Sequence, residues 1–154
     1  MTKTQYYLDI ALAVAKKATC LKKQYGAVIV NGDEIIATGF NGPPRSEPHC
    51  FTCTKKCGTG DTDEYSSCPA VHAEQNAIIS ASRKEMLGAD LYLAGWEVST
   101  DSECIKQEVI NALPCEICLR LIKNAGIDRV INRTGIVYER FSDGIMYKLG
   151  DLNG

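Results

Sequence analysis

The sequence predicts an α/β protein built around a layered sheet of mixed strand direction. Three observations support this fold class: an N-terminal segment with helical periodicity, two apolar runs separated by an Asn-Gly turn, and a later alternation of helical and strand-like segments. Strands connected through a helix are expected to run parallel, whereas hairpin strands run antiparallel. Of the 154 residues, 45% are hydrophobic and 23% are charged, so we expect a single domain over residues 1–154 with one hydrophobic core.

The first third of the chain predicts a helix followed by a β-hairpin. Apolar residues recur at helical spacing over residues 4–21. The apolar runs 25–30 and 34–40 predict two strands, and the Asn-Gly pair between them is expected to supply the positive φ angles of a tight turn. Residues 41–70 are rich in Gly, Pro, Cys and polar residues, and a loop of this length needs something to hold it in place.

The rest of the chain predicts alternating helices and strands. Helices are expected at 72–84 and 114–126, and strands at 89–95, 127–132 and 135–139. Pro114 lies near the first position of the second of these helices and Gly126 just past its end, which is the usual placement of the two residues.

Composition and charge exclude several classes of function. Lys and Arg number 17 against 19 Asp and Glu, a net charge of −2, so a broad basic surface for nucleic acid is not expected, although a small basic pocket could bind one phosphate. No apolar run approaches the ~20 residues of a membrane span, and the N-terminus lacks the apolar core of a signal peptide. We therefore expect a cytoplasmic protein, in which eight cysteines favour metal binding or catalysis over disulfides.

The densest chemical pattern joins His72-Ala73-Glu74 to the Cys115 and Cys118 pair. The two cysteines lie three residues apart at a helix start, on one face, where the helix dipole favours thiolates that bind zinc. Considered alone, the two cysteines could be a redox pair, but a redox pair would leave His72 and Glu74 without a role. With His72 as third ligand, zinc keeps an open position and lowers the pKa of bound water from ~16 to ~7. Glu74 would move the protons. Positions i and i+2 do not share a helix face, but a helix N-terminus relaxes that constraint.

The motifs H-x-E and P-C-x-x-C are typical of zinc-dependent nucleobase deaminases. Together with "YGAVIV", "IIATGFNGPPRSEPHC", "ADLYLAG" and "LPCEICLRLIKNAGIDRVI", they resemble the deoxycytidylate (dCMP) deaminase family, including its bacterial competence-operon and phage-like members, over roughly residues 5–140. The resemblance implies a three-layer α/β/α cytidine-deaminase-like fold with a mixed sheet of about five strands. The sequence departs from the family at residues 96–113, which look like an insertion before the P-C-x-x-C motif.

The resemblance also implies roles for single residues. Hydroxide would attack C4 of cytosine, and Glu74 would be the general acid/base. For Arg83, which the resemblance associates with the substrate phosphate, the alternative interpretation is an exposed cation at a helix end. The implied zinc ligands are His72, Cys115 and Cys118, and the implied substrate contacts are Asn41 (sugar hydroxyl), Ala73, Leu113 (backbone carbonyl to the exocyclic amine) and Arg83 (phosphate), with Arg45 as a second phosphate candidate.

A second, structural zinc is implied for the long loop. Some members of the family hold such a zinc at positions that correspond here to Cys20, Cys50 and Cys68. For the fourth ligand we favour Cys57, with Cys53 and His49 as alternatives. Free buried cysteines are the other interpretation, which suits Cys104 in the insertion better than the cysteines that cluster in the loop.

The function implied is hydrolysis of dCMP to dUMP and ammonia, a step of pyrimidine deoxynucleotide metabolism. Many members of the family are homohexamers that dCTP activates, with a divalent cation such as Mg²⁺, and that dTTP inhibits. The alternatives are a deaminase of a free nucleoside, a tRNA adenosine or a riboflavin precursor, and a zinc-stabilised regulatory module that has lost catalysis. The slightly acidic composition disfavours a tRNA substrate.

Overall fold

The computed structural model describes residues 1–53, 68–99 and 105–140. Its six strands are β1 (Lys23–Asn31), β2 (Glu34–Phe40), β3 (Asp90–Val98), β4 (Lys106–Glu108), β5 (Arg129–Asn132) and β6 (Gly135–Glu139). Its helices are α1 (Lys3–Ala15), α3 (Ala73–Ile79), α4 (Arg83–Met86) and α5 (Glu116–Ala125). None of the helices in these described ranges is long and apolar enough to span a bilayer.

The strands form one sheet in the order β2-β1-β3-β5-β6, and β4 pairs with β3 outside this path. Strand β1 is antiparallel to both neighbours, and β5 and β6 form an antiparallel hairpin. Only β3 and β5 pair in parallel, and α5 is the helix that connects them. This confirms the predicted mixed sheet, which is parallel where a helix connects two strands. In addition to the five expected strands, the sheet contains β4.

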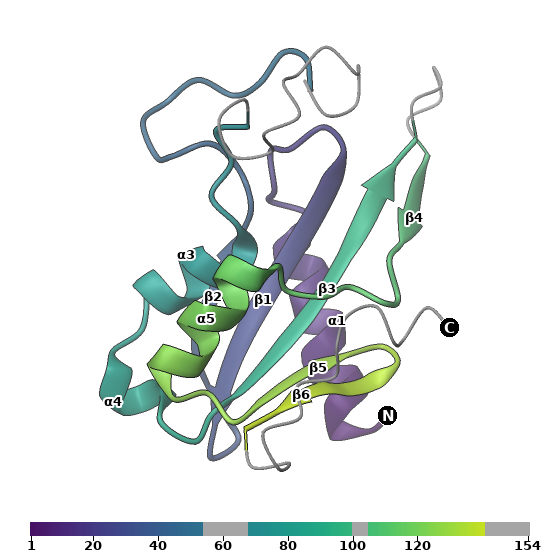
Figure 1. Cartoon of the computed structure of the whole chain (residues 1–154). Coiled ribbons are helices and arrows are strands. Elements are labelled where there is room, and N and C mark those ends of the chain that lie inside the picture. The colour runs from purple at the N-terminus through teal and green to yellow at the C-terminus, as the bar shows by residue number, and fades with distance from the viewer. Residues whose placement is uncertain (54–67, 100–104, 141–154) are drawn as a thin grey trace.

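Helices cover both faces of this sheet, with α1 behind it and α3 and α5 in front (Figure 1). The inner strand β1 is therefore buried on both sides. Ala27 and Ile29 pack into the core under α3 and α5, whereas Val28 and Val30 pack under α1 because successive side chains of a strand point to opposite faces. This arrangement confirms the predicted α/β/α layers.

The first helix is shorter than its apolar periodicity predicts and ends at Ala15. The N–H of Thr19 does not bond within the helix but donates to the carbonyl of Asn41, 3.2 Å away. A long-range bond to the loop after β2 thus replaces the helical bond and turns the chain toward β1. The prediction of a helix to residue 21 is wrong for this tertiary reason.

The helix predicted over 72–84 is two helices. The first ends at Ile79, and Ser82 then caps α4 by accepting a hydrogen bond from the N–H of Glu85 at 3.2 Å. The Glu85 side chain in turn accepts from the backbone N–H of Ser82 at 3.3 Å, which completes a capping box. This Ser-x-x-Glu spacing is a helix-start signal in the sequence that the periodicity concealed.

The hairpin turn differs in register from the prediction. Positive φ angles occur at Gly32 (56°) and Asp33 (67°), and Asn31 remains in β1, paired with Glu34. The turn is held from α1, because the Tyr7 hydroxyl donates to the Asp33 carboxylate at 2.7 Å.

Residues 96–113 are partly regular structure. Strand β3 continues to Val98, and β4 folds back antiparallel against it. Arg133 ties this part to the rest of the molecule, since its guanidinium donates to Glu108 of β4 at 2.7 Å and to Asp9 of α1 at 2.6 Å. The chain after β4 then leads directly to the start of α5.

Candidate active site

His72 lies at the start of α3 as its N-cap residue. Its backbone is extended (φ −75°, ψ 156°), so the helix proper begins at Ala73. The side chain of Gln75 accepts the His72 N–H at 2.7 Å, which satisfies one of the donors that a helix start leaves unpaired. Because His72 is outside the helix, its ring and the side chain of Glu74 need not diverge as two positions within a helix do.

Cys115 caps α5 in the same way. Its Sγ accepts the N–H of Cys118 at 3.4 Å, and Pro114 comes before the cap rather than at the first helical position. Gly126 ends the helix with a left-handed backbone (φ 85°), as its position in the sequence predicts. Both sulfurs therefore lie at the positive end of the helix dipole, which favours the thiolate.

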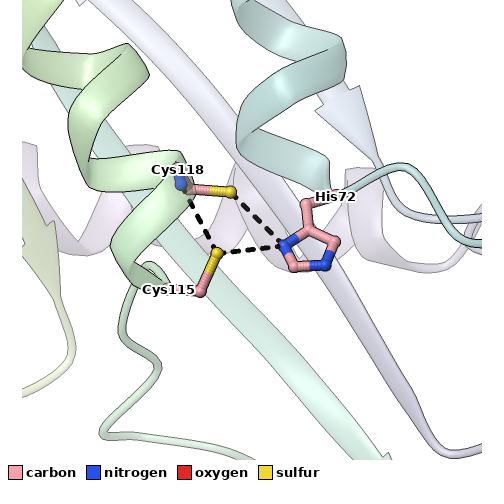
Figure 2. Close-up of side chains that lie close together, drawn as sticks. All are labelled: His72, Cys115 and Cys118. Atoms are coloured by element: carbon pink, nitrogen blue, oxygen red, sulfur yellow. Dashed lines mark hydrogen bonds between the residues drawn. The ribbon is translucent and has the colours of Figure 1, made fainter. Parts of the chain in front are cut away.

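The two helix starts meet, and three ligand atoms converge between them (Figure 2). The His72 Nδ1 is 3.6 Å from the Cys115 Sγ and 3.3 Å from the Cys118 Sγ. Tetrahedral zinc, with Zn–N near 2.0 Å and Zn–S near 2.3 Å, would hold a nitrogen and a sulfur about 3.5 Å apart. The residues therefore fit zinc. Within the described part of the chain, no other three His, Cys, Asp or Glu residues bring their ligand atoms within 4.8 Å of one another.

The electrostatics around Cys115 favour a metal ligand. Its hydrogen bond with the Cys118 thiol, assisted by His72 and by the Cys118 N–H, lowers the pKa of Cys115 to about 3 against the opposing effect of burial. The same hydrogen bond raises the pKa of the Cys118 thiol, so the two sulfurs share a proton in the absence of metal. A zinc ion held by both cysteines would take them as thiolates.

Glu74 lies at the floor of the same site. Only 4% of its surface is exposed. Burial raises the pKa of its carboxyl group, while a hydrogen bond with the Cys118 thiol and the nearby His72 act in the opposite direction. A buried carboxyl group with a raised pKa beside a metal site is suited to taking up and releasing a proton during a reaction.

A cavity of about 300 Å³ opens onto these residues, a size that suits a small ligand. It brings together three of the predicted substrate contacts, Asn41, Ala73 and Leu113, with the metal ligands His72 and Cys115. The full lining is Cys20, Lys22, Lys23, Tyr25, Asn41, Cys53, Cys68, Ala70, His72, Ala73, Glu74, Leu113 and Cys115.

Asn41 is a structural link as well as a wall of the cavity. Its Oδ1 accepts the N–H of Tyr25 at 2.7 Å, and its Nδ2 donates to the carbonyl of Lys23 at 2.8 Å. The end of β1 is thereby fixed to the loop after β2. The Asn41 side chain also forms a hydrogen bond with the Cys20 side chain, and its Oδ1 retains a second acceptor position.

The segment before α5 is also held from behind. The Asn132 side chain, 1% exposed, donates from Nδ2 to the carbonyl of Ala112 at 2.8 Å. Its Oδ1 accepts from the Thr134 N–H and hydroxyl at 2.8 and 2.6 Å. Ala112 adjoins Leu113, so this buried amide sets the path of the chain at the predicted carbonyl contact.

The two predicted phosphate contacts lie elsewhere. Arg83 is exposed at the start of α4, its Nε donates to the carbonyl of Asn124 at 3.3 Å, and it is not among the residues that line the cavity. Arg45 is exposed in the loop after β2 and does not line the cavity either. The cavity has instead Lys22, Lys23 and Tyr25, which were not among the predicted site residues. Tyr25 begins the predicted strand 25–30, and the two lysines lie shortly before it.

Cys20 and two cysteines of the long loop lie at one wall of the cavity. Cys20, Cys53 and Cys68 line it together. Burial, and then the nearby thiols of Cys68, Cys50 and Cys53, raise the pKa of Cys20 to about 11. Cys57 and Cys104 lie outside the described residues.

A family model described as "Cytidine and deoxycytidylate deaminase zinc-binding region" matches residues 1–134. The chain is 33% identical over 133 residues to the deoxycytidylate deaminase of Mycobacterium phage D29, an alignment that covers 82% of this chain and 91% of the phage protein. It is 34% identical over 132 residues to the deoxycytidylate deaminase of Saccharomyces cerevisiae, which covers 79% of this chain but 42% of the yeast protein.

The fold also resembles that of solved structures. The dCMP deaminase of the cyanophage S-TIM5 has been determined in apo form and in complex with dCMP and dUMP. Both structures superpose with a TM-score of 0.59 over 85% of this chain, at 24% and 23% sequence identity. The two alignments cover 83% and 82% of the respective cyanophage chains.

Proposed function

This chain belongs to the cytidine and deoxycytidylate deaminase family, and on that premise we propose that it hydrolyses dCMP to dUMP and ammonia. The observation that carries the proposal is the convergence of His72, Cys115 and Cys118 beside the buried Glu74, at a cavity of about 300 Å³. The phage D29 relative, similar over nearly its whole length, is a deoxycytidylate deaminase.

The chemistry divides between the metal and one carboxyl group. Zinc held by His72, Cys115 and Cys118 would lower the pKa of a water from ~16 to ~7 and so supply hydroxide at neutral pH. Glu74 takes the proton of this water and delivers it to N3 of cytosine. Attack of the hydroxide on C4 would form a C–O bond. Glu74 would then pass the proton of the new C4 hydroxyl to the amine, and the C4–N bond would break to release ammonia as the C4 carbonyl forms.

The substrate is oriented by groups that line the cavity. The Asn41 amide is proposed to bind the sugar hydroxyl, and the backbone at Ala73 and Leu113 to bind the base, with the Leu113 carbonyl accepting from the exocyclic amine. The Asn132 side chain supports this carbonyl through the neighbouring residue. The phosphate role of Arg83 stays a prediction.

The activity is tested by ammonia release from dCMP and from cytidine. Glu74→Gln should retain zinc but lose roughly 10²- to 10⁴-fold in kcat, the contribution of a general acid/base. Glu116→Gln is the matched control, because Glu116 is an exposed acid in the first turn of α5. If Glu74→Gln releases ammonia as fast as the wild type, the mechanism is wrong. If cytidine is used and dCMP is not, the substrate is wrong.

A second zinc is proposed from the family resemblance, with Cys20, Cys50 and Cys68 as ligands, and it requires these thiols to draw together, because no three described ligand atoms of this cluster lie within 4.8 Å of one another. Among the described residues Cys53 is the best fourth ligand, because it shares the cavity wall with Cys20 and Cys68, and Cys57 stays an alternative. Four thiolates without an open position are typical of structural zinc. Elemental analysis should find two zinc ions per chain, and one in Cys68→Ser; a single zinc in the wild type would exclude this site.

The assembly and regulation of the enzyme are proposed from the family alone. These proposals are a cytoplasmic homohexamer, activation by dCTP with Mg²⁺, and inhibition by dTTP. Light scattering measures the oligomeric state. Activation is tested by dCMP saturation curves with and without dCTP and Mg²⁺, and two identical hyperbolic curves would show that dCTP does not activate the enzyme.

A further inference from the structure

Asn41 is held from both sides by the segment of the chain that carries His72. Gly42, the residue after Asn41, exchanges two backbone hydrogen bonds with Val71: the Gly42 N–H donates to the Val71 carbonyl at 3.2 Å, and the Val71 N–H donates to the Gly42 carbonyl at 2.7 Å. Val71 directly precedes His72 in the sequence. The backbone on the C-terminal side of Asn41 is therefore fixed to the start of α3.

On the N-terminal side of Asn41 the connection is made by a side chain. Phe40 is the last residue of β2, and its carbonyl accepts a hydrogen bond from the Nδ2 of Asn76 at 2.8 Å. Asn76 lies in α3, two residues after Glu74, and its own N–H donates to the His72 carbonyl at 3.0 Å. Of the two connections, only this one can be removed by a substitution, because the other consists of backbone atoms.

Asn76 acts on the site without lining it. Its side chain is half-buried and is not among those that line the cavity, whereas Asn41 and Glu74 are both buried and line it. A reaction at C4 requires the reacting atoms to be held about 3–3.5 Å apart before attack. If Asn41 holds the sugar, the distance from Asn41 to the metal ligands decides where C4 lies, and the Asn76 hydrogen bond is part of the link that sets this distance.

We propose that Asn76 is a positioning residue, whose hydrogen bond to Phe40 fixes the sugar contact at Asn41 relative to His72 and Glu74. Without this bond the end of β2 is released from α3 on one side, and Asn41 can move relative to the metal ligands. Binding of the sugar then no longer places C4 for attack. This inference rests on the proposed function, because it concerns how the same site places its substrate.

The test removes the hydrogen-bond donor of Asn76. Asn76→Ala is compatible with the helix, because alanine has the highest helix propensity, and Asn76→Asp keeps the size but replaces the donor with a carboxylate that only accepts. Both should lower kcat/KM for dCMP about 10- to 100-fold, because a 1 Å misplacement can cost roughly 10²-fold in rate. Asn124→Ala is the matched control and should leave kcat/KM unchanged, since Asn124 is exposed in α5 and does not line the cavity.

The 2′,3′-dideoxy analogue of dCMP separates a positioning role from a purely structural one, because it lacks the single free hydroxyl of the dCMP sugar. The wild type should deaminate this analogue less efficiently than dCMP. Asn76→Ala should change kcat/KM for the analogue by no more than about twofold, because the sugar no longer guides the base. Equal losses on the two substrates, no loss on dCMP, or a wild type that does not distinguish the two substrates overturns the proposal.

Calorimetric binding of dUMP and of its 2′,3′-dideoxy analogue provides the same comparison without turnover. The wild type should bind dUMP more tightly, and Asn76→Ala should remove most of the difference. Thermal denaturation and zinc content establish that each variant is folded and retains its metal. A wild type that releases no ammonia from dCMP refutes the proposed function, and the binding comparison still decides the role of Asn76.

Discussion

Gly39→Ala is predicted to damage the active site without altering any residue in it. Gly39 lies in β2 where α3 crosses it. A Cβ atom there would be 2.3 Å from the carbonyl oxygen of Ala73 and 2.3 Å from the backbone nitrogen of Ala77. Both are backbone atoms, so the side chains cannot relieve the overlap. The start of α3, with His72 and Glu74, must move instead.

The size of this movement follows from the contact distances. Restoring ordinary van der Waals separation requires α3 to shift by about 1 Å. Overpacking of this kind costs typically 1–3 kcal/mol of unfolding free energy. A 1 Å misplacement of catalytic groups costs roughly 10²-fold in rate. The His72 Nδ1 would also leave its position at 3.3–3.6 Å from the two sulfurs, so that zinc affinity should fall.

The assay is kcat/KM for dCMP, combined with thermal denaturation and zinc content. Thr38→Ala is the control, because Thr38 is the exposed neighbour of Gly39 in β2. Gly39→Ala should lose activity by more than its loss of stability explains at a temperature where it is fully folded. Wild-type activity and melting temperature in Gly39→Ala would refute the inferred contact between β2 and α3.

Two further predictions concern bonds that hold the scaffold. The hydrogen bond to Asp33, and then burial, raise the pKa of Tyr7 from 10.0 to about 12. Between about pH 10 and 12 the unfolded chain loses this proton while the folded chain keeps it, so the free energy of unfolding should fall as pH rises through this window. Tyr7→Phe should lower the free energy of unfolding by about 1 kcal/mol at neutral pH and make that decline shallower in denaturation curves; an unchanged slope would contradict the assignment. Asn132→Ala should cost about 1–3 kcal/mol, because it leaves the buried carbonyl of Ala112 without its partner. Its kcat for dCMP should also fall while zinc content stays near one catalytic equivalent, whereas a purely structural role would leave the kcat of the folded fraction unchanged.

Local rules predicted those parts of the fold that depend on neighbouring residues. The strand 34–40 and the hairpin partner before it follow from apolar runs around a turn. Helix α5 begins and ends where Pro114 and Gly126 indicate, within two residues. The candidate metal ligands could be found because a histidine and two cysteines at helix starts are rare in combination and chemically specific.

Local rules failed where distant segments compete for the same backbone groups. The first helix stops at Ala15 because Thr19 bonds to Asn41, a partner 22 positions away that no helical pattern reveals. Strand β4 exists because β3 offers it an edge. Its three residues alone carry no strand signal that distinguishes them from a loop.

By itself the sequence determined the family of this protein and pointed to its candidate metal ligands and its candidate acid/base residue. Only the tertiary structure decided what surrounds that chemistry. It placed His72 outside its helix, so that ring and carboxyl group can serve one site, and it put Lys23 rather than Arg83 at the cavity. The physical reason is that ligand identity is a property of single side chains, whereas the wall of a cavity is set by which strands and helices pack together.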